Sequence, residues 1–238
     1  MPSRIVHHRT PQKRFYVEGA EYFVTSVTHE RYPYFSAPHL AQLFVEDLWF
    51  ACELKELELF GYTVMPEHVH ILFRPLGESN CSEAVGSLKR NVTRDINDLI
   101  SGHPFVRNLH LPSEGDDSNV SMDDDSDVFV EDDSNRRLRN FQITKQKHPH
   151  LTLDKYKSHF DRLESIRRSF EANKSPAIDF PHFRWQKSFR DHLIRDQRDF
   201  DNHIDYIYNN ALKHGLANAP DLWPWMWVVG MPLPLRQI

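Results

Sequence analysis

Residues 59–73 read LFGYTVMPEHVHILF, two apolar runs joined by the short turn MPE. Both runs are rich in β-branched and aromatic residues, which favours two neighbouring strands. Successive side chains of a strand point to opposite faces, so His68 and His70 share one face while Val69 turns into the core. Two imidazoles on one face can hold a divalent cation. Because a His-x-His pair also occurs in strands by chance, the metal hypothesis needs a second signal.

The sequence before and after this stretch predicts alternating strands and helices. A run typical of a strand covers Tyr22–Thr28, and an amphipathic helix is expected over Pro38–Glu58. The two strands then cover Leu59–Val64 and His68–Phe73, and a second amphipathic helix is expected over Ser82–Ile100. This order of strand, helix, strand, strand and helix indicates a small α/β sandwich (α+β), with one antiparallel sheet and helices packed on it.

A last strand and helix are predicted near the C-terminus. The stretch Phe183–Arg195 is interpreted as a loop and a strand. A helix follows, with Asp196 as N-cap and Asp199 in its first turn, where both carboxylates are favourable. It ends at Gly215, because glycine is a common C-terminal signal. The tryptophans of the stretch Trp223–Trp227 are expected to pack as an aromatic anchor.

Residues 103–178 form a long charged insertion between these two parts. Its segment Glu114–Asp133 has ten acidic residues and no basic one. Within it, Glu114–Asp127 is low in complexity, cannot bury enough apolar surface to offset its chain entropy and is expected to be disordered. A helix is expected only near Leu151–Ser169. The predicted layout is a basic N-terminal arm at 1–14, a catalytic domain formed by 15–102 and 179–227, the insertion at 103–178 and a tail at 228–238.

Composition limits the class of protein. The net charge is −5, yet outside the acidic segment the chain has 24 acidic and 29 basic residues, which is compatible with a phosphate-bearing partner. Cys52 and Cys81 are the only cysteines, so we expect no disulfide framework or cysteine zinc site, and a reducing, cytoplasmic location. No apolar run approaches the roughly 20 residues needed to cross a membrane. The polar, basic first residues predict no secretory signal.

The last predicted helix supplies the second signal. Tyr206 and Asn210 are four residues apart, so they lie on one face of the helix. A tyrosine beside an amide oxygen is a candidate nucleophile next to a third metal ligand. The alternative is that Tyr206 and Tyr208 are ordinary half-buried helix aromatics with satisfied hydroxyls.

Taken together, these motifs resemble a known family. The string MPEHVHILF at 65–73 resembles the Leu-Pro-Glu-His-hydrophobic-His motif of the HUH single-tyrosine transposases. Within that class, FRWQKSFRDH at 183–192, IRDQRDF at 194–200 and HIDYIYNNALKHG at 203–215 resemble the REP-associated tyrosine transposases, as does the WPW that follows. The resemblance covers roughly residues 14–100 and 183–227 and implies a ferredoxin-like fold.

The resemblance also implies roles for individual residues. His68, His70 and Asn210 would be ligands of a divalent metal, Mg²⁺ or Mn²⁺, and Tyr206 would be the nucleophile. Glu67 matches a motif position without an assigned role. Where the family usually has Asn-Pro, this chain has Asn210-Ala211, and we expect no loss of chemistry because alanine suits a helix.

The substrate implied by the resemblance is single-stranded or hairpin DNA, cleaved and rejoined through a 5′-phosphotyrosine intermediate. Basic and aromatic residues near the motifs are candidate DNA contacts, although each is also compatible with a solvated charge or a core aromatic. The candidates for DNA binding are Arg14, Lys89, Arg90, Arg94, Arg184, Trp185, Gln186 and Lys187, with Phe189 as a second stacking face.

Three other functions stay open at this point. The chain is compatible with a domesticated hairpin-DNA-binding protein that no longer cleaves, with a metal-dependent phosphohydrolase, and with an interaction protein that works through its acidic segment. A phosphohydrolase would need carboxylate ligands, for which the matched segments offer Asp191 and Asp205 at most. The sequence does not decide between a monomer and a homodimer, nor does it identify the DNA sequence.

Overall fold

The computed structural model describes residues 16–105, 133–173 and 180–233. The predicted contact Arg14 lies outside these residues, as does nearly all of the acidic segment. The helices and strands, in chain order, are β1 (Tyr22–Val27), α1 (Pro38–Lys55), β2 (Leu57–Met65), β3 (His68–Pro75), α2 (Cys81–Ser101), α3 (Asp133–Lys147), α4 (Leu153–Ala172), β4 (Arg190–Leu193), α5 (Gln197–Lys213) and β5 (Met226–Val228). Short 3₁₀ helices lie at His29–Arg31, Tyr34–Ser36 and Pro220–Leu222.

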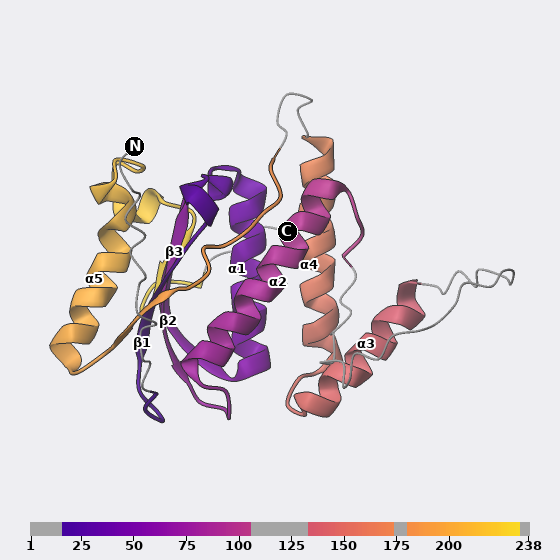
Figure 1. The fold of residues 1–238 in the computed structure, drawn as a ribbon, viewed down its shortest axis with the longest axis horizontal. Helices are drawn as coiled ribbons and strands as arrows, with labels where there is room; N and C mark the ends of the chain where they lie inside the picture. The colour runs from indigo at the N-terminus through magenta and orange to yellow at the C-terminus, as the bar shows by residue number, and fades with distance from the viewer. Residues whose placement is uncertain (1–15, 106–132, 174–179, 234–238) are drawn as a thin grey trace, which may run out of the picture.

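The strands form one antiparallel sheet in the order β4-β1-β3-β2-β5 (Figure 1). The first four strands of the chain and the helices α1 and α2 follow the order βαββα…β with spatial order 4-1-3-2, which is the ferredoxin-like arrangement. The predicted fold class is therefore confirmed. The strand β5 pairs with β2 and extends the sheet at that edge.

Helices cover both faces of the sheet. The helices α1 and α2 pack on the face that carries Val69, Ile71 and Phe73, where the main core lies. The helix α5 packs on the opposite face, where Ile207 joins a second cluster that includes Leu72. Figure 1 shows α5 on one side of the sheet and α1 with α2 on the other. Since side chains alternate along β3, His68 and His70 lie on the α5 face.

The described part of the insertion is helical. The helix expected near Leu151–Ser169 is present as α4, which packs on α1 and adds side chains to the main core. The helix α3 was not expected from the sequence. It has few apolar residues, and the ring of its Phe141 lies 5.4 Å from that of Tyr156 in α4, so tertiary packing supports it.

The start and end of α5 follow their predicted signals. The side chain of Asp196 accepts a hydrogen bond from the Asp199 N–H at 2.8 Å, which caps the helix. After the helix, Gly215 adopts a left-handed φ of 67°. The aromatic anchor is confirmed too, because Trp227 lies 5.4 Å from Trp49 of α1 between ring centroids. None of the helices in the described ranges combines the length and apolar character that a membrane span requires.

Candidate functional site

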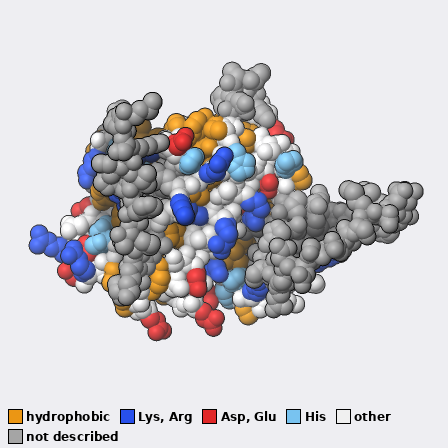
Figure 2. Space-filling view, in the orientation of Figure 1, with side chains coloured by type: hydrophobic (Ala, Val, Ile, Leu, Met, Phe, Trp, Pro, Cys, Tyr) orange, Lys and Arg blue, Asp and Glu red, His pale blue; other side chains and the backbone are white. Residues whose placement is uncertain are grey.

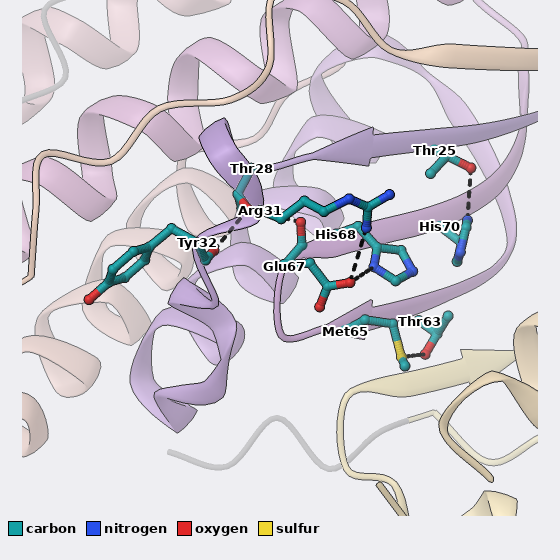
Figure 3. Close-up of polar contacts among 9 residues, drawn as sticks. All are labelled: Thr25, Thr28, Arg31, Tyr32, Thr63, Met65, Glu67, His68 and His70. Atoms are coloured by element: carbon teal, nitrogen blue, oxygen red, sulfur yellow. Dashed lines mark hydrogen bonds and ion pairs between the residues drawn. The ribbon is translucent and has the colours of Figure 1, made fainter. Parts of the chain in front are cut away.

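The two histidines of β3 lie side by side under α5, with 4.7 Å between their ring centroids. Both are buried, at 8% and 4% exposure. The carboxylate of Glu67 lies 3.0 Å from His68 Nδ1, and the Thr25 hydroxyl lies 2.8 Å from His70 Nδ1 (Figure 3). With each Nδ1 held by a neighbouring side chain, the Nε2 atoms are the ones left to bind a ligand.

Three buried polar atoms at this site, one on His70 and two on Asn210, have no partner in the described structure. His70 Nε2 makes no hydrogen bond, and neither amide atom of Asn210 does, although Asn210 is completely buried. Buried polar groups are almost always satisfied, so such atoms need an explanation. An imidazole nitrogen and an amide oxygen are both donors to divalent metals, and a bound cation would satisfy them.

Both imidazoles are held in the neutral form. Burial lowers the pKa of His68, and the Glu67 carboxylate opposes this shift only in part. Burial lowers the pKa of His70 to about 3, and the nearby His68, His214 and His203 add to the shift. A metal competes with protons for the same lone pair, so both side chains are ready to act as ligands at neutral pH.

Tyr206 lies beside the pair, as the resemblance predicts. Its ring centroid is 5.1 Å from that of His70. Phe23 of β1 stacks on His70 at 5.2 Å and meets the edge of Tyr206 at 5.8 Å, while Lys213 Nζ lies 5.2 Å above the Tyr206 ring. The tyrosine is 36% exposed, so a large substrate can reach it. Asn210 follows one helical turn later.

The predicted DNA contacts fall into two groups. Lys89, Arg90 and Arg94 belong to α2, on the opposite face of the sheet from Tyr206, and the structure does not bring them to the tyrosine. Lys89 donates to the Gln186 carbonyl at 3.0 Å, and Arg94 forms an ion pair with Asp95 at 2.9 Å. Figure 2 shows Lys and Arg side chains spread over α2 and the segment that leads to β4.

The segment 184–187 runs along the end of β1. Arg184, Gln186 and Lys187 are exposed there. Trp185 is only half-buried, but its ring packs against Phe35, Phe44 and Phe183 with centroid distances of 5.1–6.2 Å. Phe189 is buried in the same core. These two rings therefore hold this segment on the sheet, and Phe189 has no exposed face for a base.

Several side chains of the site were not identified from the sequence. Phe23 and Thr25 reach the pair because β1 is the neighbour of β3, with Thr25 directly opposite His70. Lys213 and His214 extend the site at the C-terminal end of α5, and the His214 ring lies 6.2 Å from that of His68. The alternation of polar residues in β1 is the one sequence signal that could have indicated Thr25, but the pairing of β1 with β3 cannot be deduced from it.

Two other groups of side chains have ligand atoms close enough to share a metal. Among the described residues these are His192 with Asp199 and His203, and Asp47 with Asp95 and His159. In the first group, Asp199 accepts from Arg195 and His192, which hold its pKa well below the usual range. Hydrogen bonds and ion pairs therefore already occupy this carboxylate. Neither group includes the pair on β3.

Comparisons with known proteins agree with the geometry. The model of the IS200-like transposase family matches residues 16–106. A REP-associated tyrosine transposase of Haemophilus influenzae is 51% identical over 41 residues, which are 17% of this chain and 23% of that protein. One of Escherichia coli is 45% identical over 40 residues, which are 17% of this chain and 24% of that protein. The matches thus span about a quarter of these relatives.

A solved structure of a REP-associated tyrosine transposase bound to a REP hairpin aligns with 92% of this chain and 82% of that chain, at 17% identity and a TM-score of 0.43. Of the motifs quoted from the sequence, the string at residues 65–73 lies within the family match at residues 16–106, and the motifs at 183–215 lie outside it. The resemblance is therefore confirmed: residues 16–106 match the IS200-like transposase family, and short stretches of the chain are similar to REP-associated tyrosine transposases.

Proposed function

We propose that this chain cleaves and rejoins single-stranded or hairpin DNA, with Tyr206 as the nucleophile. The observation that carries the proposal is the position of the Tyr206 ring, 5.1 Å from His70 and next to buried donor atoms that have no partner. A purely structural role for this tyrosine would not explain why unsatisfied polar atoms of His70 and Asn210 are buried next to it. The partial exposure of Tyr206 also suits a nucleophile that must reach a polymer.

His68, His70 and Asn210 are the residues that would hold a divalent metal, Mg²⁺ or Mn²⁺. Two neutral imidazoles and an amide oxygen fit such an ion, and Mn²⁺ accepts imidazole more readily than Mg²⁺ does. When bound, the metal would polarise the scissile phosphate and offset the charge that develops in the transition state.

The chain's own side chains would then carry the reaction. The Tyr206 oxygen forms a bond to phosphorus and its proton passes to solvent, while the bond from phosphorus to the 3′-oxygen breaks and that oxygen takes up a proton from solvent. The products are a 5′-phosphotyrosine and a free 3′-hydroxyl. A second 3′-hydroxyl can displace the tyrosine and rejoin the strand, because the phosphodiester energy is kept. Phe23 and Lys213 fix the ring from two sides.

The substrate class is proposed from the family relationship together with the site. The exposed side chains of Arg184, Gln186 and Lys187 next to β1 would contact the strand. The second function that the chain supports is hairpin binding without cleavage, as in a domesticated copy. Both functions share the same fold and differ in whether Tyr206 forms a covalent bond.

The test is to incubate the full chain with labelled hairpin DNA from the flanks of its own gene, with Mn²⁺ or Mg²⁺, and to run a denaturing gel. We expect a covalent protein–DNA band and a nicked product with the wild type. Tyr206→Phe should abolish both, whereas Tyr208→Phe, on the same helix, should keep them. A hairpin that shifts on a native gel but never forms the covalent band would favour the binding function.

A further inference from the structure

The turn that follows β1 has an unusual backbone. Glu30 and Arg31 both adopt positive φ angles, 53° and 55°, although neither is glycine. Each such residue costs on the order of 1 kcal/mol or more, and backbone strain of this kind is concentrated at functional sites. The turn is held firmly at both sides, because Thr28 N–H donates to the Glu67 carbonyl at 2.9 Å and His29 N–H donates to the Arg184 carbonyl at 2.8 Å.

The strained turn places an arginine beside the metal-binding pair. Arg31 Nη1 lies 3.4 Å from Glu67 Oε1, and the same oxygen lies 3.0 Å from His68 Nδ1. Figure 3 shows the Arg31 side chain extending over Glu67 toward His68. The Arg31 side chain is 65% exposed, so this ion pair adds little to stability and does not explain the turn.

The turn that carries Arg31 contacts two parts of the proposed DNA site. On one side is His68, with His70 and Tyr206 beyond it. On the other side is the segment 184–187, which is bonded to the end of β1 through Gln186 N–H and the Val27 carbonyl at 2.8 Å. A strand that ran from Tyr206 to this exposed basic segment would pass Arg31.

We propose that Arg31 binds a phosphate of the DNA strand next to the phosphate that Tyr206 attacks. The guanidinium has five N–H donors in a planar fork that matches phosphate oxygens, and Glu67 engages one of its nitrogens at long range. The Arg31 side chain is 65% exposed, so its other donors are accessible to a phosphate. This inference rests on the proposed function, because it needs DNA at Tyr206.

The test measures DNA binding in the Tyr206→Phe background, where cleavage does not interfere. The probe is the same hairpin with a single-stranded extension, and its dissociation constant is measured over a range of salt concentrations. Arg31→Ala should weaken binding roughly tenfold and reduce the slope of log Kd against log salt by about 0.7 to 0.9, the value for one lost phosphate contact. Arg168→Ala, on α4 across the sheet, should change neither quantity.

A second measurement separates this role from a structural one. If Arg31 only oriented Glu67 and His68, Arg31→Ala would weaken Mn²⁺ binding by the DNA-free protein and leave the salt slope unchanged, which would overturn the proposal. We expect the reverse, with Mn²⁺ binding retained. If the Tyr206→Phe protein itself does not bind the hairpin, the proposed function is refuted. If that protein binds normally and adding Arg31→Ala leaves the slope of log Kd against log salt unchanged, the role of Arg31 alone is refuted.

Discussion

At the scale of single residues, each imidazole of the pair depends on a different neighbour. Glu67, from the turn before β3, holds His68, and Thr25, from the adjacent strand, holds His70. Such outer partners fix the tautomer and orientation of a ligand, and their loss typically weakens metal binding or activity. The site therefore extends beyond the residues that would touch the metal.

Replacing Thr25 tests this dependence. Thr25→Val removes the hydroxyl from His70 Nδ1 and keeps the shape of the side chain. We expect Mn²⁺ to bind about ten- to a hundredfold more weakly, measured by calorimetry. The matched control is Thr63→Val, because Thr63 faces His70 from the other neighbouring strand but its hydroxyl contacts Met65. Equal losses in both variants would show that the Thr25 hydrogen bond has no special role.

The burial of His70 predicts how stability depends on pH. The unfolded chain takes up a proton on this histidine below about pH 6.5, whereas the folded chain takes it up only near pH 3. Because the unfolded state binds more protons in that window, stability is lost as the pH falls. The slope should approach about 1.4 kcal/mol per pH unit for this group.

The measurement is the free energy of unfolding of the metal-free protein between about pH 6 and 4.5, compared between variants because carboxylates begin to titrate at the lower end of this range. His70→Gln should reduce the slope of the free energy of unfolding against pH by the equivalent of about one proton. The control is His29→Gln, which replaces an exposed histidine of the turn and should leave this slope unchanged. A curve for His70→Gln that runs parallel to the wild-type curve would mean that His70 is not held neutral by burial.

The sequence predicted which residues the structure brings together in the candidate site, but not the packing of its surroundings. His68, His70, Tyr206 and Asn210 sit in motifs with local spacing, so alternation and helical periodicity place them on shared faces. Trp185 also sits in a matched motif, yet its ring packs among other aromatics. A motif indicates which residues matter, whereas burial depends on segments far away in the chain.

At the scale of elements, the site forms where α5 meets the sheet. Gly61 of β2 lies close to β5 at this place, because a Cβ there would lie only 3.1 Å from Val228 Cγ1 and 3.2 Å from the Trp227 carbonyl oxygen, while Ile207 Cδ1 of α5 would be at 3.4 Å, an ordinary contact. A carbonyl oxygen of β5 cannot move without disturbing the strand pairing. A Cβ at Gly61 would thus press first on β5, and through it on α5, which packs against β5.

We expect Gly61→Ala to destabilise the fold by roughly 1–3 kcal/mol, the usual range for overpacking, and to slow formation of the covalent adduct. Thermal unfolding and the gel assay measure the two effects. Gly86→Ala is the control, because its Cβ would meet only a flexible arginine end at 3.4 Å in the middle of α2. This control should be stabilising, since alanine favours a helix. A Gly61→Ala protein as stable as the wild type would contradict the close-approach argument.

Local signals account for most of the elements. Periodicity predicted α1, α2 and the two central strands to within a few residues, and Asp196 marked the start of α5. The order of strands in the sheet, the edge strand β5 and the helix α3 could not be predicted. Each depends on contacts between distant segments, such as those between α3 and α4, and no local pattern encodes them.

At the scale of the whole molecule, one face of the sheet forms the main core and the other carries the candidate site. One face and the helices α1, α2 and α4 form the main core. The other carries the histidine pair, and α5 covers it with Tyr206 and Asn210. Because the two regions lie on opposite faces, α4 can pack on α1 without approaching Tyr206. We therefore expect substitutions in α4 to leave the geometry of the candidate site unchanged.

The most direct test of the central claim is to locate the DNA-linked residue by mass spectrometry after the cleavage reaction. Trypsin should release residues 199–213, which contain both Tyr206 and Tyr208, so fragmentation of this peptide decides between them. We expect the nucleotide mass on Tyr206. A nucleotide on Tyr208 or elsewhere, or cleaved DNA with no modified peptide, would contradict the assignment of Tyr206 as the nucleophile.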